Sequence, residues 1–461
     1  MLRRAARAVA AAGPGRWAIF FALAAFVVRF PFLFGRHSPP PGDDAFVFLD
    51  LANGLVHGKG FQGHHFWTPG YPAFEAALQI VPRRWEDAIV IVQHLLGVGV
   101  TVAVLLGAWR WFGRAVALMA ASLVGFTPML VIHEHTLLPD FLFGTIVLAG
   151  AAVLVEAVRR DPPPLRLLVL VGVLFGAATW VKPAGQFLLF AAPPALLFAT
   201  RDWRRTLKGS ALVALVLVLV VSPWIVRNAI DFNLVQMSDQ GDRTLFYRVF
   251  GVGELPIPTD SADGRFVAAA YARTASQNPA AREHAVNEAL KTERGKDEDG
   301  AGKLERELAL TAIARHPLDY VADSGRFLSD DLGLTRSFEG KNALLTELNA
   351  TNPPFPKLFP RKLWALAHAL VAVWWVVSLH ALAGLLALFT GPPERRRATA
   401  ALVSVWLALS LGTVLTHGGL WRYSVQTASI VFMVGSAGAV IVISAVLSRV
   451  RGSPPPTGSR A

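Results

Sequence analysis

Two adjacent carboxylates, Asp43 and Asp44, open a segment whose apolar residues have helical spacing from Ala45 onward. A helix N-terminus favours negative charge, so one interpretation of this pair is an N-cap. The other is catalytic, because a carboxylate beside a partly apolar wall has a raised pKa and can act as a general base. The residues themselves leave both interpretations open.

The segment continues through Gly58-Lys59-Gly60-Phe61 and His64-His65 to Trp67-Thr68-Pro69-Gly70-Tyr71-Pro72. Two prolines and a glycine around Tyr71 predict a stiff, non-helical strut. Such a strut would hold the Asp pair in place.

Further along, the stretch 133–140 adds the acids Glu134 and Asp140. His133, Glu134 and His135 are consecutive and do not share a helix face, so they are not a helical zinc signature. A structural role for these histidines is favoured over metal ligation.

Three cations, Lys182, Arg227 and Arg422, lie near the ends of apolar runs. Snorkelling at a membrane surface explains each of them singly. Together they predict a cavity for an anionic headgroup such as a phosphate.

With the Asp pair these cations indicate group transfer from a lipid phosphate, in which the base deprotonates an acceptor hydroxyl and the cations stabilise the departing phosphate. The chain has no G-x-x-x-x-G-K-[ST] loop, so a lipid-borne donor is expected rather than a nucleotide.

The composition of the chain predicts which structural elements position these charged residues. The chain has 461 residues, of which 53% are hydrophobic and only 16% charged, and no cysteine. These values are typical of a membrane protein. Ten apolar runs are long enough to span a bilayer, which predicts an all-α polytopic protein with about ten transmembrane helices. The runs are 17–34, 87–109, 115–132, 140–158, 166–181, 184–200, 209–226, 362–389, 398–416 and 424–448.

The distribution of charge predicts the orientation. Arginine clusters alternate with the apolar runs in a way that places both termini in the cytoplasm, and the net charge of +12 reflects these clusters rather than a nucleic-acid partner. Of the 32 acidic residues, 20 lie between Asn228 and Pro360. We therefore predict three parts: a membrane module over 1–226 whose first outer loop, 35–86, carries interfacial helices, a small outer-face domain over 227–361, and a second membrane module over 362–461. Helices are expected in the outer domain near 265–277, 279–294 and 302–316.

The chain resembles the GT-C superfamily of multispanning glycosyltransferases, in particular the branch of dolichyl-phosphate-mannose protein mannosyltransferases and lipid A aminoarabinose transferases. The resemblance is carried by an ordered series of short motifs, each weak alone: Asp44 with Phe48 and Leu51-Ala52-Asn53, Gly58-Lys59-Gly60-Phe61, Pro69-Gly70-Tyr71-Pro72, Leu137 to Phe141, Val181-Lys182-Pro183, Pro223-Trp224 with Arg227-Asn228, His316 to Tyr320, and Arg422-Tyr423.

The resemblance implies an inverting transfer of a sugar from a polyprenyl-phosphate lipid, with an acid of the first outer loop as base. Asp44 matches this position better than Asp43, and the second-loop acid corresponds to Asp140, with Glu134 as a rival. The remaining expected site residues are the donor-phosphate contacts Lys182, Arg227, Arg422 and Tyr423, and the substrate-loop residues Phe48, Lys59, His65 and Tyr71. The sequence departs from many relatives in having Phe48 in place of tyrosine and Lys182 in place of arginine, which keeps the charge but loses bidentate geometry.

No cofactor is certain. Some relatives use a divalent metal such as Mg²⁺ or Mn²⁺ and others none, and Asp44 and Asp140 are the residues that would hold one. The acceptor is left open between a glycan, a lipid and a protein. The alternative functions are a lipid or solute transporter that uses the same outer cavity and a non-catalytic envelope scaffold. The expected location is the plasma (inner) membrane, with the active site on its outer face.

Overall fold

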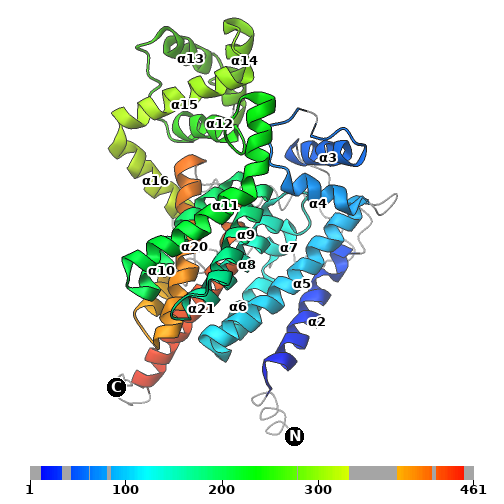
Figure 1. Ribbon diagram of the computed structural model, residues 1–461, viewed down its shortest axis with the longest axis vertical. Helices are drawn as coiled ribbons and strands as arrows, with labels where there is room; N and C mark the ends of the chain where they lie inside the picture. Colours follow the sequence, from blue (N-terminus) through cyan, green and yellow to red (C-terminus); the bar gives the residue numbers. More distant parts are fainter. Residues whose placement is uncertain are drawn as a thin grey trace.

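The computed structural model describes residues 12–33, 43–61, 63–79, 85–277, 279–331, 382–417 and 422–450. Every regular element within these ranges is a helix, which confirms the predicted all-α class. Long helices lie side by side, and a group of shorter helices that includes α13, α14 and α15 sits at one end of them (Figure 1).

Long apolar helices form the bundle. Six described stretches are long and apolar enough to cross a bilayer, so the chain is a multi-pass membrane protein. They lie in α5 (Trp85–Phe112), α8 (Asp140–Val158), the pair η1 (Pro183–Phe190) and α10 (Ala192–Thr200), α11 (Trp203–Phe232), α20 (Pro393–Thr416) and α21 (Arg422–Val450).

Three more helices lie at predicted spans: α2 (Pro14–Leu33), α6 (Arg114–Phe126) and α9 (Leu165–Val181). The predicted run 115–132 is interrupted, because α6 ends before Thr127 and a short helix, α7 (Pro128–His133), follows. Thr127 has an extended backbone, as expected for a residue that precedes a proline. Most of the predicted span 362–389 lies outside the described residues, which include the short helix η3 (Leu385–Leu388).

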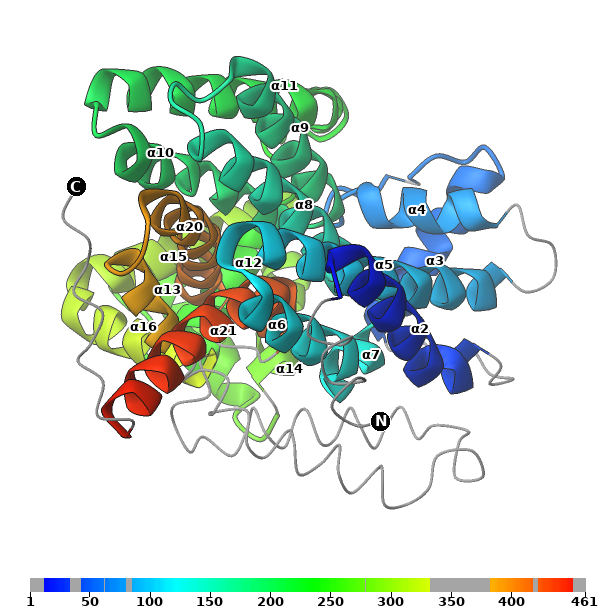
Figure 2. The same ribbon diagram turned by 90° about the horizontal axis from the view of Figure 1, so that it is seen from below.

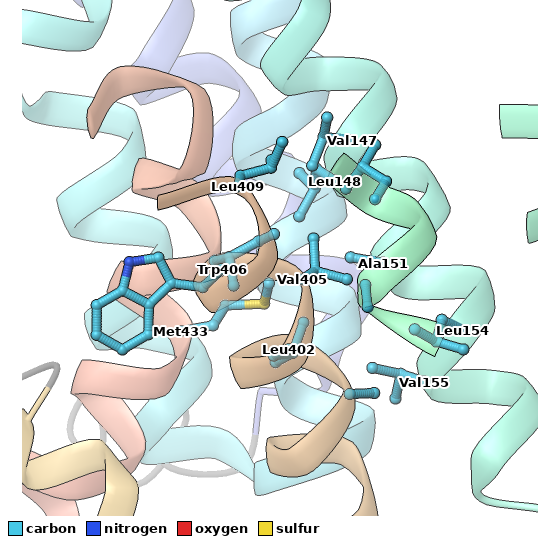
Figure 3. Packing of buried hydrophobic residues seen from close by; sticks show 14 of the residues in the cluster. Val147, Leu148, Ala151, Leu154, Val155, Leu402, Val405, Trp406, Leu409 and Met433 are labelled. Atoms are coloured by element: carbon cyan, nitrogen blue, oxygen red, sulfur yellow. The ribbon is translucent and has the colours of Figure 1, made fainter. Parts of the chain in front are cut away.

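Apolar side chains of α8, α20 and α21 meet in the centre of the bundle. Val147, Leu148 and Ala151 of α8 lie beside Leu402 and Leu409 of α20 in Figure 3. Small residues let the backbones approach closely: a Cβ added at Gly144 would lie 2.9 Å from the carbonyl oxygen of Gln426. This contact places the start of α21 against the first turns of α8.

The first predicted outer loop contains two short helices, α3 (Asp43–Val56) and α4 (Gly70–Leu78). The prediction of a non-helical strut around Tyr71 was wrong, because Tyr71 and Pro72 belong to the first turn of α4. Proline is tolerated there, since the first backbone N–H groups of a helix have no partner within it. α4 lies against the end of α9, and a Cβ at Gly70 would be 2.6 Å from the backbone of Trp180.

The polar stretch after α11 folds into helices around a second hydrophobic core. Its elements are α12 (Gln240–Phe246), the π-helix η2 (Tyr247–Val252), α13 (Ala262–Arg273), α14 (Pro279–Arg294), α15 (Glu298–Arg315) and α16 (Pro317–Asp331). Phe246, Val267, Val286 and Ala309 are among the buried residues of this core. Helices α13 to α15 correspond to the three predicted near 265–277, 279–294 and 302–316. Their location on the outer side of a membrane stays a prediction.

The start of α2 and the end of α21 lie at the end of the bundle opposite these polar helices (Figure 1). Figure 2 looks along the bundle from that end. The functional site described next lies toward the other end, beneath α12.

Candidate functional site

A pocket lies between α3, the turn before α4, the start of α8, the junction of α9 with η1, α12 and the end of α20. Four residues singled out from the sequence line it: Asp44, Phe48, Asp140 and Lys182. The fold thus brings one acid of the first loop, the acid of the second loop and one cation into a single pocket.

Asp140 and Lys182 form an ion pair in this pocket. The distance from Lys182 Nζ to Asp140 Oδ1 is 2.6 Å, and Gln426 Nε2 donates a second hydrogen bond, of 2.7 Å, to the same oxygen. Asp140 is the first residue of α8, where the helix dipole favours an anion. Its side chain is only 2% exposed, so Lys182 and Gln426 supply the partners that a buried carboxylate needs.

Lys182 is held by the way α9 ends. The backbone leaves the helix at Lys182 in an extended conformation, and Pro183 starts η1 directly afterwards. Thr68 Oγ1 donates a 3.1 Å hydrogen bond to the carbonyl of Val181, which ties this junction to the loop before α4. The start of η1 and the bond from Thr68 therefore hold the backbone that carries the Lys182 side chain.

Asp44 reaches the pocket from the first turn of α3, and its side chain is partly exposed. The helix N-terminus stabilises a negative charge there. The next turn of α3 carries Phe48, which packs edge-on against Trp67, with 4.8 Å between the ring centroids, and against Tyr71, with 5.4 Å. This aromatic contact fixes α3, and so the acid, relative to α4.

Tyr71 supports the pocket from behind rather than lining it. Its side chain is fully buried, and its hydroxyl donates a 3.2 Å hydrogen bond to Gln93 Oε1. Burial, together with the nearby carboxyl groups of Glu75 and Asp140, raises the pKa of Tyr71 well above its usual value. Gln93 in turn donates to the backbone carbonyls of Glu134 and Thr136, which fixes the loop that leads to Asp140.

Glu134 lies outside the pocket, in a buried cluster. Both of its carboxylate oxygens accept hydrogen bonds of 2.6 Å from Arg29 of α2, and His94 Nδ1 lies 3.0 Å from Oε2. His94 Nε2 is 3.2 Å from His135 Nδ1. Burial and the neighbouring His94 lower the pKa of His135 to about 3, so His135 is neutral. The arrangement gives Glu134 a paired structural position.

Arg227 also lies outside the residues that line the pocket. Its guanidinium group is 4.6 Å from the ring centroid of Trp224 and 4.7 Å from that of Phe232. It donates a 2.8 Å hydrogen bond to the carbonyl of His64 and pairs with Asp231. Arg227 thus anchors the first loop to α11.

The other substrate-loop candidates are placed apart from the pocket as well. His65 Nδ1 lies 3.2 Å from Asp239 Oδ2, and Lys59 is exposed. The side chains of Asp43, Arg422 and Tyr423 lie outside what the structure describes.

Several residues that the sequence did not single out belong to the site or support it. Gln426 is a buried amide near the start of an otherwise apolar span, and Arg29 is a charge within the first apolar run; both are recognisable signals of a polar contact inside the bundle. Gln240 and Thr413 also line the pocket. They carry no signal in the sequence, because an uncharged side chain shows its role only when tertiary structure places it.

The donor set fits a divalent metal poorly. Of the two candidate ligands, Asp140 is already bonded to the Lys182 ammonium, whose charge would repel a cation at the same carboxylate. Among the described residues, no group of three or more His, Asp or Glu side chains is arranged to hold a metal ion.

The fold and a segment of the sequence are shared with membrane glycosyltransferases. Residues 69–226, about a third of the chain, match the model of the family described as dolichyl-phosphate-mannose-protein mannosyltransferase. This segment includes α4, the second loop with Asp140, and the Lys182 junction. No curated protein matches the sequence.

A solved oligosaccharyltransferase shares the arrangement of helices. The oligosaccharyltransferase of Archaeoglobus fulgidus in its apo form superposes with a TM-score of 0.50 and 14% identity over 96% of this chain; the chain spans about half the length of that protein, 52%. ArnT from Cupriavidus metallidurans in the apo state gives a TM-score of 0.39 and 17% identity, covering 87% of this chain and 78% of that chain. The same ArnT bound to undecaprenyl phosphate gives 0.40 and 15%, covering 96% and 82%.

The chain is therefore a multi-pass membrane protein whose fold is similar to that of a glycosyltransferase. Over residues 69–226 the sequence is similar to the dolichyl-phosphate-mannose-protein mannosyltransferase family, and the helices are arranged as in an oligosaccharyltransferase.

Proposed function

We propose that the chain transfers a sugar from a polyprenyl-phosphate lipid to an acceptor hydroxyl, with Asp44 as general base. One observation carries this proposal: Asp44 and the Asp140–Lys182 pair line the same pocket. The matching family, described as dolichyl-phosphate-mannose-protein mannosyltransferase, supports a polyprenyl-phosphate donor.

In the proposed reaction, Asp44 accepts the proton of the acceptor hydroxyl as its oxygen attacks the anomeric carbon of the sugar. The bond between that carbon and the phosphate oxygen breaks, and the polyprenyl phosphate leaves with the electron pair. Attack from the face opposite the leaving group inverts the anomeric configuration. Asp44 ends the step protonated and returns the proton to solvent.

Lys182 stabilises the negative charge that develops on the leaving phosphate. An ammonium group carries three N–H donors, so its bond to Asp140 is compatible with a further bond to a phosphate oxygen. Asp140 then orients Lys182 rather than taking a proton. Arg227 is assigned the anchoring of the first loop, because its guanidinium group holds the carbonyl of His64.

The distribution of basic residues supports an outer-face site. α8 runs from Asp140, in the pocket, to Arg159 and Arg160 just beyond its other end, and α20 starts close to Arg395 and ends at the pocket. Arg159 Nη2 lies 2.9 Å from Glu394 Oε2, which places these two far ends side by side. Basic clusters mark the cytoplasmic side, so we propose cytoplasmic termini and a pocket on the outer face of the plasma membrane. The outer face would also hold the predicted domain at 227–361.

The acceptor is proposed only as a hydroxyl-bearing molecule at the membrane surface, whether glycan, lipid or protein. A transporter needs polar groups along a path through the membrane, whereas the charged lining residues here are gathered in one pocket. The buried charges of Arg29 and Glu134 are paired with one another.

The test is the donor requirement of the purified protein in nanodiscs. Labelled sugar is supplied on a polyprenyl phosphate, on a polyprenyl pyrophosphate, or as a nucleotide sugar, with a panel of simple hydroxyl acceptors. Transfer from the polyprenyl phosphate alone is the expected result. Transfer from the nucleotide sugar, or movement of the intact lipid across the bilayer without bond cleavage, would contradict the proposed function.

A further inference from the structure

One part of the pocket is lined by uncharged hydrogen-bonding side chains. Gln240 comes from the first turn of α12, Thr413 comes from the last turn of α20, and His417 directly follows α20. The charged lining residues, Asp44, Asp140 and Lys182, come from other elements. The pocket is therefore lined by both charged and uncharged polar side chains.

Gln240 is held in the pocket by the start of its helix. Its backbone N–H donates a 3.0 Å hydrogen bond to Ser238 Oγ, and Ser238 Oγ donates to the carbonyl of Phe66. Trp67 and Thr68, the next residues along the first loop, line the same pocket. The first turn of α12 is thus tied to one wall of the pocket, and the side-chain amide of Gln240 has no hydrogen-bond partner among the described residues.

The other end of the same helical segment is tied to α20. Arg248 of η2 is fully buried, and its Nε donates a 2.9 Å hydrogen bond to the carbonyl of Val414. Tyr320 of α16 donates through its hydroxyl to the next carbonyl, that of Leu415. A cation at the end of a helix satisfies unpaired carbonyls and complements the dipole.

These two bonds fix the last turn of α20, which contains Thr413 and is directly followed by His417. The ring of His417 is oriented further by Thr416, whose Oγ1 lies 2.7 Å from Nδ1. Arg248 itself is held by Ser324, whose Oγ lies 2.9 Å from Nη2, and by the rings of Tyr320 and Phe327. The segment from Gln240 to Val252 therefore bridges two walls of the pocket and fixes the uncharged polar side chains on both sides.

We propose that Gln240, Thr413 and His417 bind the hydroxyl groups of the transferred sugar, and that the sugar is an uncharged hexose or pentose. The amide of Gln240 and the imidazole of His417 can donate and accept hydrogen bonds, as sugar hydroxyls require. The hydroxyl of Thr413 donates to the carbonyl of Leu409, so it offers the sugar an acceptor. Gln240 and Thr413 carry no charge, so they offer no cation to a sugar carboxylate. Arg248 is the positioning residue, because it acts on the sugar only through the last turn of α20. This inference rests on the proposed function for the identity of the lipid that carries the sugar.

The test measures the binding of four lipids to the full chain in nanodiscs. One is bare polyprenyl phosphate, and the other three are polyprenyl phosphates that carry a neutral hexose, a neutral pentose or a uronic acid. The readout is the ratio of the dissociation constant of the bare lipid to that of each glycosylated lipid. The wild type is expected to bind at least one neutral glycolipid more tightly than the bare lipid, and the uronic acid lipid no more tightly.

Gln240→Ala is expected to lower this ratio roughly three- to tenfold, the effect of one lost hydrogen bond, without changing affinity for the bare lipid. The matched control is Thr244→Ala on the same helix, whose hydroxyl bonds only to the carbonyl of Gly241. It is expected to leave the ratio unchanged. An unchanged ratio in Gln240→Ala, or equal loss of affinity for both lipids, would overturn the assignment.

Arg248→Lys keeps the charge but loses the planar donor geometry, and is expected to lower the ratio while leaving bare-lipid affinity intact. If this variant does not fold, Thr413→Val removes one hydroxyl at nearly constant volume and carries the same expectation. Wild-type transfer together with a ratio independent of Gln240 would overturn this inference alone. A Gln240-dependent ratio without any transfer would overturn the proposed reaction and leave sugar recognition standing.

Discussion

Lys182 Nζ lies 2.6 Å from Asp140 Oδ1, so the cation at the end of one span is paired with the acid that starts another. The pair joins α8 to the α9–η1 junction and lines the same pocket as Asp44. The position of Lys182 is thus set by Asp140, and Asp44 is the other carboxylate that lines the pocket.

Replacing Lys182 should remove stabilisation of the leaving phosphate. Lys182→Met is expected to lower kcat/KM roughly 100-fold, whereas Lys182→Arg, which keeps the charge, should lose about tenfold or less. The control is Lys208→Met, an exposed lysine at the far end of α11. Equal activity of Lys182→Met and the wild type, measured by transfer in nanodiscs, would remove Lys182 from the mechanism.

The Arg29–Glu134 pair should be a stability determinant, and two glycines of α5 test this without changing any charge. A Cβ at Gly97 would collide with the carboxylate of Glu134, whereas a Cβ at Gly99 meets open space. Gly97→Ala is expected to destabilise the protein by about 1–3 kcal/mol through this collision, with Gly99→Ala neutral or slightly stabilising. Thermal unfolding in detergent measures both. Equal unfolding temperatures would contradict the close contact.

Glu75 should make stability depend on pH. Its side chain in α4 is fully buried, its carboxyl oxygens have no hydrogen-bond partner among the described residues, and burial raises its pKa from 4.5 to about 9. Above pH 4.5 the unfolded chain loses this proton and the folded chain keeps it, so stability falls as pH rises toward 9.

Glu75→Gln does not titrate, so it should be more stable than the wild type by roughly 4 kcal/mol at pH 8 and equal to it near pH 4.5. Glu307→Gln, at an exposed position of α15, is the control and should follow the wild type at each pH. The measurement is the unfolding curve of each protein, recorded at pH values from 4.5 to 8. Parallel pH profiles for Glu75→Gln and the wild type would show that Glu75 is not buried as a neutral acid.

The positions of the helices were largely readable from the sequence, because apolar runs and arginine clusters report directly on burial in a bilayer. α14 has the predicted bounds of 279–294. The strut predicted around Tyr71 was wrong for a local reason: prolines at 69 and 72 suit a helix start as well as an extended segment, and only the contact of Gly70 with Trp180 selects the helix.

The charged residues of the candidate site could be predicted from the sequence. Asp140 and Lys182 are rare charges at the ends of apolar runs, Asp44 lies in the first predicted outer loop, and the structure places all three at one pocket. Glu134 carries the same sequence signal, yet lies with Arg29, because its position relative to α2 depends on the packing of helices far apart in the chain. Gln240 lies 196 positions from Asp44 and becomes part of the pocket only through the bonds that tie α12 to the first loop.

The central claim, that Asp44 takes the proton of the acceptor, is tested most directly by comparing two acids of one helix. Asp44 lines the pocket and Asp50 is exposed on α3. Asp44→Asn is nearly isosteric and is expected to lower kcat roughly 100- to 10,000-fold while donor affinity changes little, and Asp50→Asn should leave both unchanged. The measurement is single-turnover sugar transfer in nanodiscs with donor binding determined in parallel. Full turnover by Asp44→Asn would contradict the account.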